Sequence, residues 1–252
     1  MNYVNPPEKT PQYITHKTFF SQTLNHEIGY CIYLPPGYAA GDKRFPAVYH
    51  IHGWQGNESS EIWSLEKAYA GRQAITVFAN AVSDKSEYRD ALLQIETVVV
   101  RELIPYVEGR YRTYENRESR TLSGFSMGGA MAFYYAVKHC AMFGAVIPYA
   151  ATFHHQYHKG YRGVNEPREK AAGLYNSMLA ENRHLEGDNI LCLVSQNADK
   201  IRGVLNIDMR IGADDILICD NDIMHMYLNS LDIPHSYGVF PGAGHELHII
   251  CG

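Results

Sequence analysis

The chain has 252 residues, of which 46% are hydrophobic and 19% charged, and its formal net charge at pH 7 is −5. A chain of this size and composition is expected to fold as one α/β domain with a full hydrophobic core. The acidic charge and the lack of a Lys/Arg cluster exclude nucleic acid as an expected partner. No apolar run is long enough to span a bilayer, so no membrane partner is expected either.

The first thirteen residues, 1–13, form a Pro-rich lead-in, and residues 14–252 are expected to form the single folded domain. The lead-in lacks the apolar segment of a secretory signal. Two interpretations therefore remain open: a cytosolic protein, or a secreted domain from which a signal or a neighbouring domain has been trimmed.

The sequence of the first half of the domain predicts mostly strands, followed by a long helix. Residues 14–34 alternate loosely in polarity and predict one or two antiparallel strands. Two short apolar runs, 45–52 and 73–79, are typical of buried strands, and a short helix is expected between them over 61–70. Leu, Ile and Val at helical spacing then predict a long amphipathic helix over 90–109.

The second half alternates strands with helices. A strand over 119–124 runs directly into a helix over 127–139. Further elements are predicted as a strand at 144–150, a helix at 168–182, a strand at 204–212, a helix at 219–231 and a strand at 235–240. This alternation predicts a mainly parallel sheet with helices on both faces. Functional residues of such sheets lie just after the carboxyl ends of strands.

The strongest motif is Gly124-Phe-Ser126-Met-Gly128, which lies between the predicted strand and helix. A Gly-x-Ser-x-Gly in this context forms a sharp turn that projects the serine hydroxyl above the sheet. The alternative is a glycine-rich turn with an incidental serine. The flanking strand and helix favour Ser126 as a nucleophile.

A serine hydroxyl needs a base to remove its proton, and His245 lies in a glycine-rich loop after the last predicted strand. This is the position of the base in the chain order Ser, Asp, His. A surface histidine with no catalytic role is the simpler interpretation elsewhere in a sequence. His248, three residues later, is the rival candidate.

The histidine in turn needs a carboxylate to fix its tautomer. Four aspartates follow the predicted strand 204–212 closely enough to serve, and each also fits a helix cap or a solvated loop: Asp214, Asp215, Asp220 and Asp222. Spacing alone does not separate the first two.

The oxyanion of the tetrahedral intermediate is usually held by two backbone N–H groups. One belongs to the residue after the nucleophile, Met127. The second is expected in the loop His52-Gly-Trp-Gln-Gly56, from Trp54, with Gln55 as the second choice.

Substrate contacts are predicted at Gln55, Trp63, Phe153 and Tyr157, although Trp63 fits packing beneath the early loop equally well. The segment 153–158 also carries histidines at i and i+4, as in some metal sites. No nearby acidic or thiol ligand completes such a site, so neither a metal nor another cofactor is expected.

The run from about 28 to 246 resembles the esterase-D-like α/β hydrolases, and most closely the feruloyl and acetylxylan esterases of carbohydrate esterase family one. The matching motifs are Tyr33-Leu-Pro-Pro-Gly-Tyr38, His52-Gly53 with Gly56-Asn-Glu58, Glu102-Leu-Ile-Pro-Tyr-Val-Glu108 with Arg110-Tyr-Arg-Thr113, Arg120-Thr-Leu-Ser-Gly-Phe-Ser126-Met-Gly-Gly129, Gly212-Ala-Asp-Asp215 and Gly242-Ala-Gly-His245-Glu246. The early loop lacks the Cys-rich pattern of S-formylglutathione hydrolases, which argues against that branch.

The resemblance implies an α/β-hydrolase fold, Asp215 as the acid, and metal-free acyl transfer through Ser126 and His245. Its first implied function is release of ferulic or related hydroxycinnamic acids from cell-wall arabinoxylan. The alternatives are deacetylation of xylan or general short-chain esterase action, and a silent binding module of the same fold. The implied partner is a feruloylated or acetylated polysaccharide or oligosaccharide, and the resemblance favours a secreted, multi-modular enzyme.

Overall fold

A computed structural model describes residues 2–153, 166–181 and 189–252. It contains one eight-stranded sheet with the strand order β1-β2-β4-β3-β5-β6-β7-β8. In chain order the strands are β1 (Ile14–Ser21), β2 (His26–Tyr33), β3 (Ala47–Ile51), β4 (Ile75–Ala79), β5 (Arg120–Phe125), β6 (Ala145–Tyr149), β7 (Asn206–Gly212) and β8 (Ser236–Phe240). The strands β1 and β2 form an antiparallel hairpin, and β2 pairs antiparallel with β4. The remaining pairs are parallel, which confirms the predicted mainly parallel sheet.

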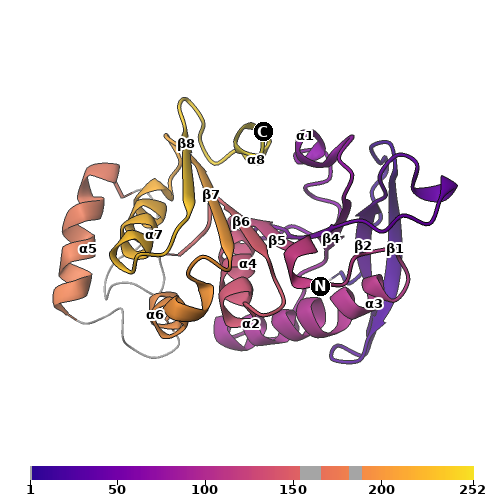
Figure 1. Cartoon of the computed structure of the whole chain (residues 1–252), viewed down its shortest axis with the longest axis horizontal. Helices are drawn as coiled ribbons and strands as arrows, with labels where there is room; N and C mark the ends of the chain where they lie inside the picture. Colours follow the sequence, from indigo (N-terminus) through magenta and orange to yellow (C-terminus); the bar gives the residue numbers. More distant parts are fainter. Residues whose placement is uncertain (1, 154–165, 182–188) are drawn as a thin grey trace.

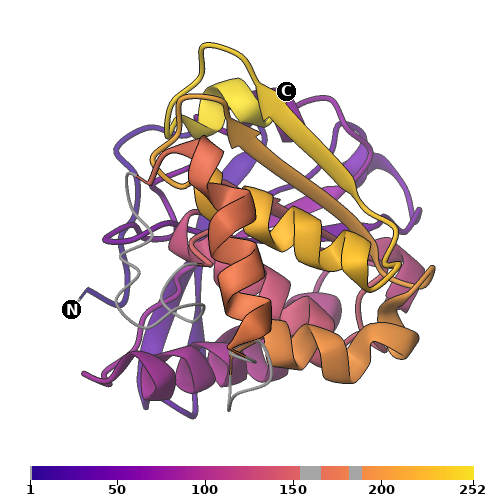
Figure 2. The same ribbon diagram turned by 90° about the vertical axis from the view of Figure 1, so that its left-hand side faces the viewer.

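The described helices are α1 (Glu66–Tyr69), α2 (Tyr88–Glu96), α3 (Ile104–Glu108), α4 (Met127–Lys138), α5 (Ala171–Ala180), α6 (Ile190–Ile201), α7 (Ile218–Ser230) and α8 (Leu247–Ile250). The short helices α1 and α8 cover one face of the sheet, and α2, α3, α4 and α6 cover the other (Figure 1). At the β8 end, α5 packs across α7 (Figure 2). No described helix is long and apolar enough to cross a lipid bilayer.

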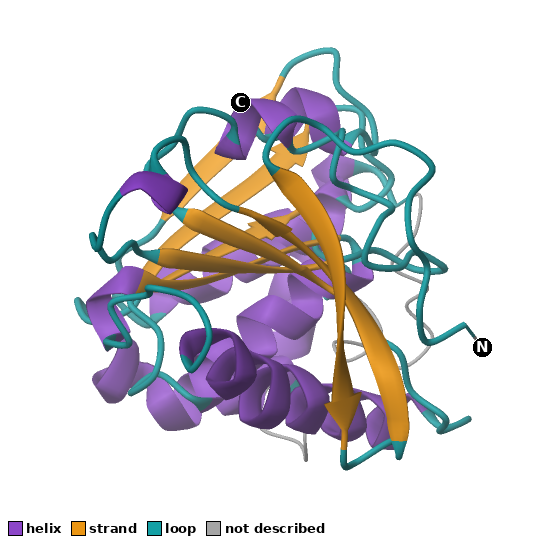
Figure 3. Ribbon diagram, turned by 90° about the vertical axis from the view of Figure 1, so that its right-hand side faces the viewer, coloured by secondary structure: helices purple, strands orange, loops and turns teal. Residues whose placement is uncertain are grey.

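Each face of the sheet carries its own hydrophobic core because side chains alternate along the strands. In β2, Ile28, Tyr30 and Ile32 join the core under α2 to α4, whereas Cys31 and Tyr33 join the core under α1 and α8. The sheet twists strongly, and the long β1–β2 hairpin curves along one edge (Figure 3). Both faces are therefore covered, as parallel strands require.

The predicted helix over 90–109 is present as three consecutive helical segments. Between α2 and α3 lies a π-helical stretch, Thr97–Leu103, and four of its seven residues are buried. The sequence expectation missed α6, which begins after Asn189, whose side-chain oxygen accepts the Leu191 N–H at 2.8 Å. The parallel strands β3, β5, β7 and β8 end at one edge of the sheet, and the predicted site residues follow these ends.

Candidate active site

Ser126 stands between the last residue of β5 and the first residue of α4. Its backbone is strained into φ 55° and ψ −117°, a region that non-glycine residues rarely adopt. A Cβ on Gly124 would lie 2.1 Å from the Gly128 oxygen, and one on Gly128 would lie 2.0 Å from the Ile51 oxygen. The two flanking glycines are therefore required by close backbone approach. The turn has the geometry predicted for a nucleophile-bearing elbow.

Two loops at the same edge bring Asp215 and His245 into contact. The Asp215 Oδ2 atom accepts a hydrogen bond from His245 Nδ1 at 2.8 Å, and Oδ1 accepts the Leu217 N–H at 2.8 Å. The carboxylate is 2% exposed. Because a carboxylate only accepts hydrogen bonds, Nδ1 carries the proton and Nε2 of the neutral ring has a free lone pair.

The ring of His245 packs against Phe125, with ring centroids 4.5 Å apart and planes inclined by 33°. Phe125 is the residue before Ser126, so this contact places the imidazole of His245 beside the turn that carries Ser126. Further support comes from Gly212, where a Cβ would lie 2.1 Å from the Ala243 oxygen. The loops after β7 and β8 are thus packed directly on one another.

The rival acid and base candidates lie in different surroundings. Asp214 is exposed, and its N–H donates to the Ala243 oxygen. Asp220 lies in the first turn of α7, and Asp222 accepts hydrogen bonds from Arg168 and Tyr237. His248 is exposed on α8. The geometry therefore separates Asp215 from Asp214, which sequence spacing did not.

The loop after β3 is held by hydrogen bonds at its first two residues. His52 donates from Nδ1 to the Gly53 oxygen at 2.8 Å and accepts the Ala81 N–H at Nε2 at 3.0 Å. Burial lowers the pKa of His52, which favours the neutral ring that this acceptor role needs. The Gly53 oxygen also accepts the Gly56 N–H at 3.0 Å. Trp54, 74% exposed, therefore lies in a tight turn of fixed backbone.

A buried carboxylate that sequence reasoning missed supports the same loop. Glu61 accepts the Gly53 N–H at 2.9 Å through Oε1 and contacts His50 Nε2 at 2.5 Å through Oε2. His50 lies on β3, and its Nδ1 is 2.9 Å from Ser123 Oγ on β5. A single acidic residue eight positions after Gly53 forms no recognisable motif, so no pattern in the sequence points to Glu61.

A cavity of about 730 Å³ is lined by Trp54 and Met127, the two residues predicted to hold the oxyanion, and Met127 directly follows Ser126, which is itself outside the lining. Its apolar lining consists of Ala81, Val82, Ala91, Ile95, Met127 and Met131. Amide side chains from Gln55, Asn57 and Asn80 contribute to its polar lining. An apolar cavity with a few polar groups is the usual form of a site for a small organic group.

The four predicted substrate contacts lie in different places. Gln55 lines this cavity, whereas Trp63, 53% exposed, lines a separate hollow of about 470 Å³. Phe153 is 1% exposed and packs edge-on against Phe133 at 5.4 Å, so in this structure it lies in the core. Tyr157 lies outside the described residues. Within the described part of the chain, no three His, Cys, Asp or Glu side chains group as metal ligands would.

A model of the family described as "Putative esterase" matches residues 21–247. An esterase of Mycobacterium tuberculosis is 26% identical over 157 residues, covering 58% of this chain and 33% of the relative. An endo-1,4-beta-xylanase/feruloyl esterase of Xylanibacter ruminicola is 26% identical over 151 residues, covering 52% of this chain and 20% of the relative. The matched region is therefore a third or less of the length of these relatives.

The solved structure of a ferulic acid esterase superimposes with a TM-score of 0.69 at 25% identity, covering 94% of this chain and 92% of the other. The S-formylglutathione hydrolase of Staphylococcus aureus gives the same TM-score at 16% identity, covering 93% of this chain and 92% of the other. At that identity the likeness shows the fold alone. These superpositions confirm the predicted α/β-hydrolase fold.

Proposed function

Because the chain belongs to the esterase family whose model matches residues 21–247, we propose that it is a serine carboxylesterase that releases hydroxycinnamic acids such as ferulic acid from plant cell-wall arabinoxylan. Family membership bears out the resemblance to esterases that the sequence motifs suggested. The observation that carries the proposed chemistry is the 2.8 Å contact between Asp215 and His245 beside the strained Ser126 elbow.

The proposed reaction has two acyl-transfer steps. Ser126 Oγ attacks the ester carbonyl carbon while its proton passes to His245 Nε2, and Asp215 stabilises the resulting imidazolium. The carbonyl electron pair moves onto oxygen, where the N–H groups of Trp54 and Met127 are assigned to hold it. The C–O bond to the alcohol breaks as His245 returns the proton to the leaving oxygen. Water then attacks the acyl-enzyme with the same base and releases the acid.

The size and lining of the cavity support an aromatic acyl group. A volume of about 730 Å³ beside Trp54 and Met127 far exceeds the single methyl of an acetyl group. The apolar lining suits a planar ring, and the amide groups suit the ring's hydroxyl and methoxy substituents. The relative of Xylanibacter ruminicola is named a feruloyl esterase joined to a xylanase, which supports a polysaccharide partner and a multi-modular setting.

The test compares methyl ferulate with p-nitrophenyl acetate for the wild type and Ser126→Ala. We expect feruloyl turnover by the wild type and a fall of at least about 10³-fold in the variant, because loss of a catalytic serine removes the acyl-enzyme route. Circular dichroism of Ser126→Ala controls for folding. Near wild-type turnover by the variant would refute the assignment of the nucleophile.

Two alternatives give different outcomes in the same assay. Turnover of acetate but not of ferulate would move the function to deacetylation or short-chain esterase action, with the mechanism retained. A folded wild type that turns over neither ester would favour a silent binding module. The hydrogen-bonded Asp215–His245 pair argues against that module, since ligand binding alone does not require it.

A further inference from the structure

Residues 2–5, called the N-terminal strap below, lie against the cavity that contains Trp54 and Met127. The side of the cavity formed by the strap includes Asn2 and Asn5. The strap belongs to the Pro-rich lead-in, for which the sequence predicted no role at the site. The strap can act as part of the surface of this cavity if its contacts hold it in one position.

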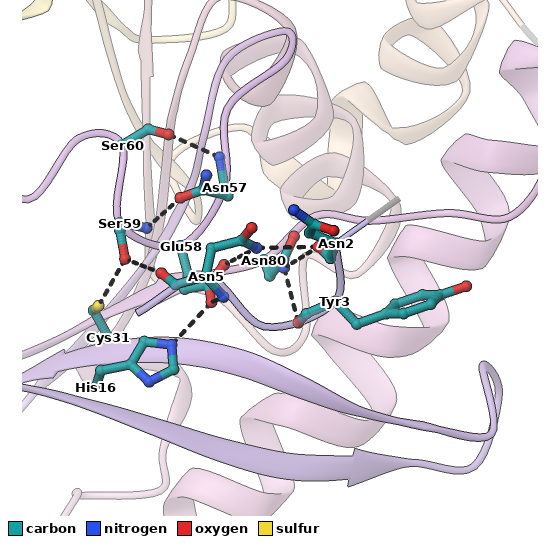
Figure 4. A network of polar contacts seen from close by, with 10 residues as sticks. All are labelled: Asn2, Tyr3, Asn5, His16, Cys31, Asn57, Glu58, Ser59, Ser60 and Asn80. Carbon is teal, nitrogen blue, oxygen red and sulfur yellow. Dashed lines mark hydrogen bonds and ion pairs between the residues drawn. The ribbon is translucent and has the colours of Figure 1, made fainter. Parts of the chain in front are cut away.

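The first anchor of the strap is the buried carboxylate of Glu58, whose side chain is 0% exposed. It accepts the Asn5 backbone N–H at 2.5 Å and the Asn5 Nδ2 at 3.0 Å, and it contacts His16 Nε2 at 2.9 Å (Figure 4). Ser59 Oγ donates to the Asn5 oxygen at 2.5 Å. A Cβ on Gly29 would lie 1.9 Å from Glu58 Oε1, so a glycine is needed beside this carboxylate.

The second anchor is Tyr3. Its backbone oxygen accepts the Asn80 Nδ2 at 3.0 Å (Figure 4). The same oxygen accepts the Gly29 N–H at 2.7 Å, and the Tyr3 ring stacks on His26 with centroids 4.3 Å apart. Asn80 follows β4 and itself lines the cavity. The strap is therefore tied both to the β1–β2 hairpin and to the wall of the cavity.

These contacts give the strap a fixed position in the folded protein. Glu58 is a buried charge, and leaving it without its partners would cost far more than an ordinary surface contact. Four of the hydrogen bonds to Asn5 and Tyr3 use backbone atoms of these two residues, which hold the chain itself. The strap thus adds a polar wall to a cavity whose lining elsewhere includes Val82, Ile95 and Met131.

We propose that the N-terminal strap determines acyl-group specificity, with Asn2 and Asn5 forming the wall that meets the distal end of a long or aromatic acyl group in this cavity. The Asn5 Nδ2 donates to Glu58 and to the Asn2 oxygen, so it holds this wall in place. On this proposal a two-carbon acyl group does not reach the wall, whereas a longer one does. The identity of the preferred acyl group rests on the proposed function, but the role of the strap does not.

The test measures kcat/KM for a series of p-nitrophenyl esters with acetyl, butyryl, octanoyl and feruloyl groups. The leaving group is constant, so differences report the acyl side alone. The variants are Asn5→Ala and Glu58→Gln. The matched control is Asn206→Ala, which removes an exposed amide at the amino end of β7, at the opposite edge of the sheet.

We expect Asn5→Ala to lower kcat/KM for the feruloyl or octanoyl ester by about fivefold relative to the acetyl ester, as loss of about one hydrogen bond's worth of binding implies. Glu58→Gln should lower the same ratio at least as much, because it weakens the anchor of the strap. Thermal melting identifies any variant that fails to fold. If Glu58→Gln does not fold, the result for Asn5→Ala alone tests the proposal.

An unchanged acyl-length ratio in folded Asn5→Ala would overturn the proposal, and so would an equal change in Asn206→Ala. An equal loss on all four esters would also overturn it, since the strap would then support the fold and not the specificity. If the wild type does not cleave the feruloyl ester, the proposed function fails while the octanoyl-to-acetyl ratio still tests the strap.

Discussion

At the scale of single residues, one buried carboxylate adds to the hydrogen bonds that hold the loop after β3. Glu61 accepts the Gly53 N–H through one oxygen and contacts the His50 ring through the other. The Trp54 N–H that is assigned to the oxyanion follows Gly53 directly. Glu61 is therefore expected to act on catalysis through the loop, as a positioning residue that does not touch the substrate.

We predict that Glu61→Gln lowers kcat for p-nitrophenyl acetate by about tenfold and changes KM by less than about twofold, since oxyanion donors matter in the transition state. The new side chain has only one accepting oxygen, so its amide nitrogen either faces the Gly53 N–H, where the hydrogen bond is lost, or faces His50 Nε2, where the hydrogen bond must reverse its direction. Steady-state kinetics checks this, with Glu66→Gln in α1 as the matched control. A rise in KM at constant kcat would contradict it.

The sequence predictions for the candidate site rest on local patterns. Ser126 and Met127 follow from the glycine spacing of the elbow, and His245 follows from its place after the last strand. Asp215 needed the structure or a family resemblance, because Asp214 fits the same spacing. Phe153, predicted to contact substrate, lies in the core, because an aromatic residue after a strand has the same pattern whether it faces a ligand or the core.

At the scale of elements, the ends of α2 and α4 are joined by a buried charge cluster. Glu96, the last residue of α2, accepts hydrogen bonds from Lys138 at 2.8 Å and from His139 at 2.7 Å at the end of α4. Burial raises the pKa of Glu96, but the hydrogen bonds from His139 and Lys138 outweigh it, and the net pKa is lowered. The ionised form of Glu96 is therefore more favoured in the folded protein than in the unfolded chain.

This shift predicts a pH-dependent stability. A lowered folded-state pKa stabilises the protein above the unfolded pKa of about 4.3, and the stabilisation is lost as the pH falls through the folded value. We expect Glu96→Gln to lower the free energy of unfolding by about 1–3 kcal/mol at pH 7. The difference from wild type should shrink below about pH 4. Urea unfolding at both pH values tests this, and a constant difference would contradict it.

Helices with a clear hydrophobic periodicity and defined ends could be predicted from the sequence. Other helical features could not be predicted, because they depend on tertiary packing. The helix over 127–139 was predicted within one residue of α4 (Met127–Lys138). The helix α6 was missed although Ile190, Leu191, Val194, Ala198 and Ile201 are buried at helical spacing. The π-helical stretch within the predicted helix over 90–109 had no sequence signal, because its apolar residues fit an α-helix as well.

At the scale of the whole molecule, the two ends of the parallel strands have different roles. The carboxyl ends of the strands carry the site, and the amino end of β5 carries Arg120, which is buried. Arg120 donates to both oxygens of Glu108 at 2.8 Å and 2.9 Å and to the Met142 oxygen at 2.6 Å. This pair ties β5 to the end of α3.

We predict that Arg120→Met lowers the free energy of unfolding by about 3 kcal/mol, because it leaves a largely buried carboxylate without its partner. The kcat of the folded protein should stay within about twofold of wild type at low temperature, since the site lies at the other end of the strands. Chemical unfolding and steady-state kinetics on the same preparation test both parts. A fall in kcat without loss of stability would contradict the separation of the two ends.

The position of β3 in the sheet has a consequence for how the protein folds. Ala47 of β3 pairs with Ile75 of β4 on one side and with Arg120 of β5 on the other, so neighbouring strands are distant along the chain. Closing such long loops is entropically costly, and parallel pairings of this kind form slowly. Ser126 leaves the ribosome long before His245 does. Under the proposed mechanism, a nascent chain therefore carries Ser126 as an ordinary hydroxyl until β7 and β8 join the sheet and the loops after them bring Asp215 and His245 to it.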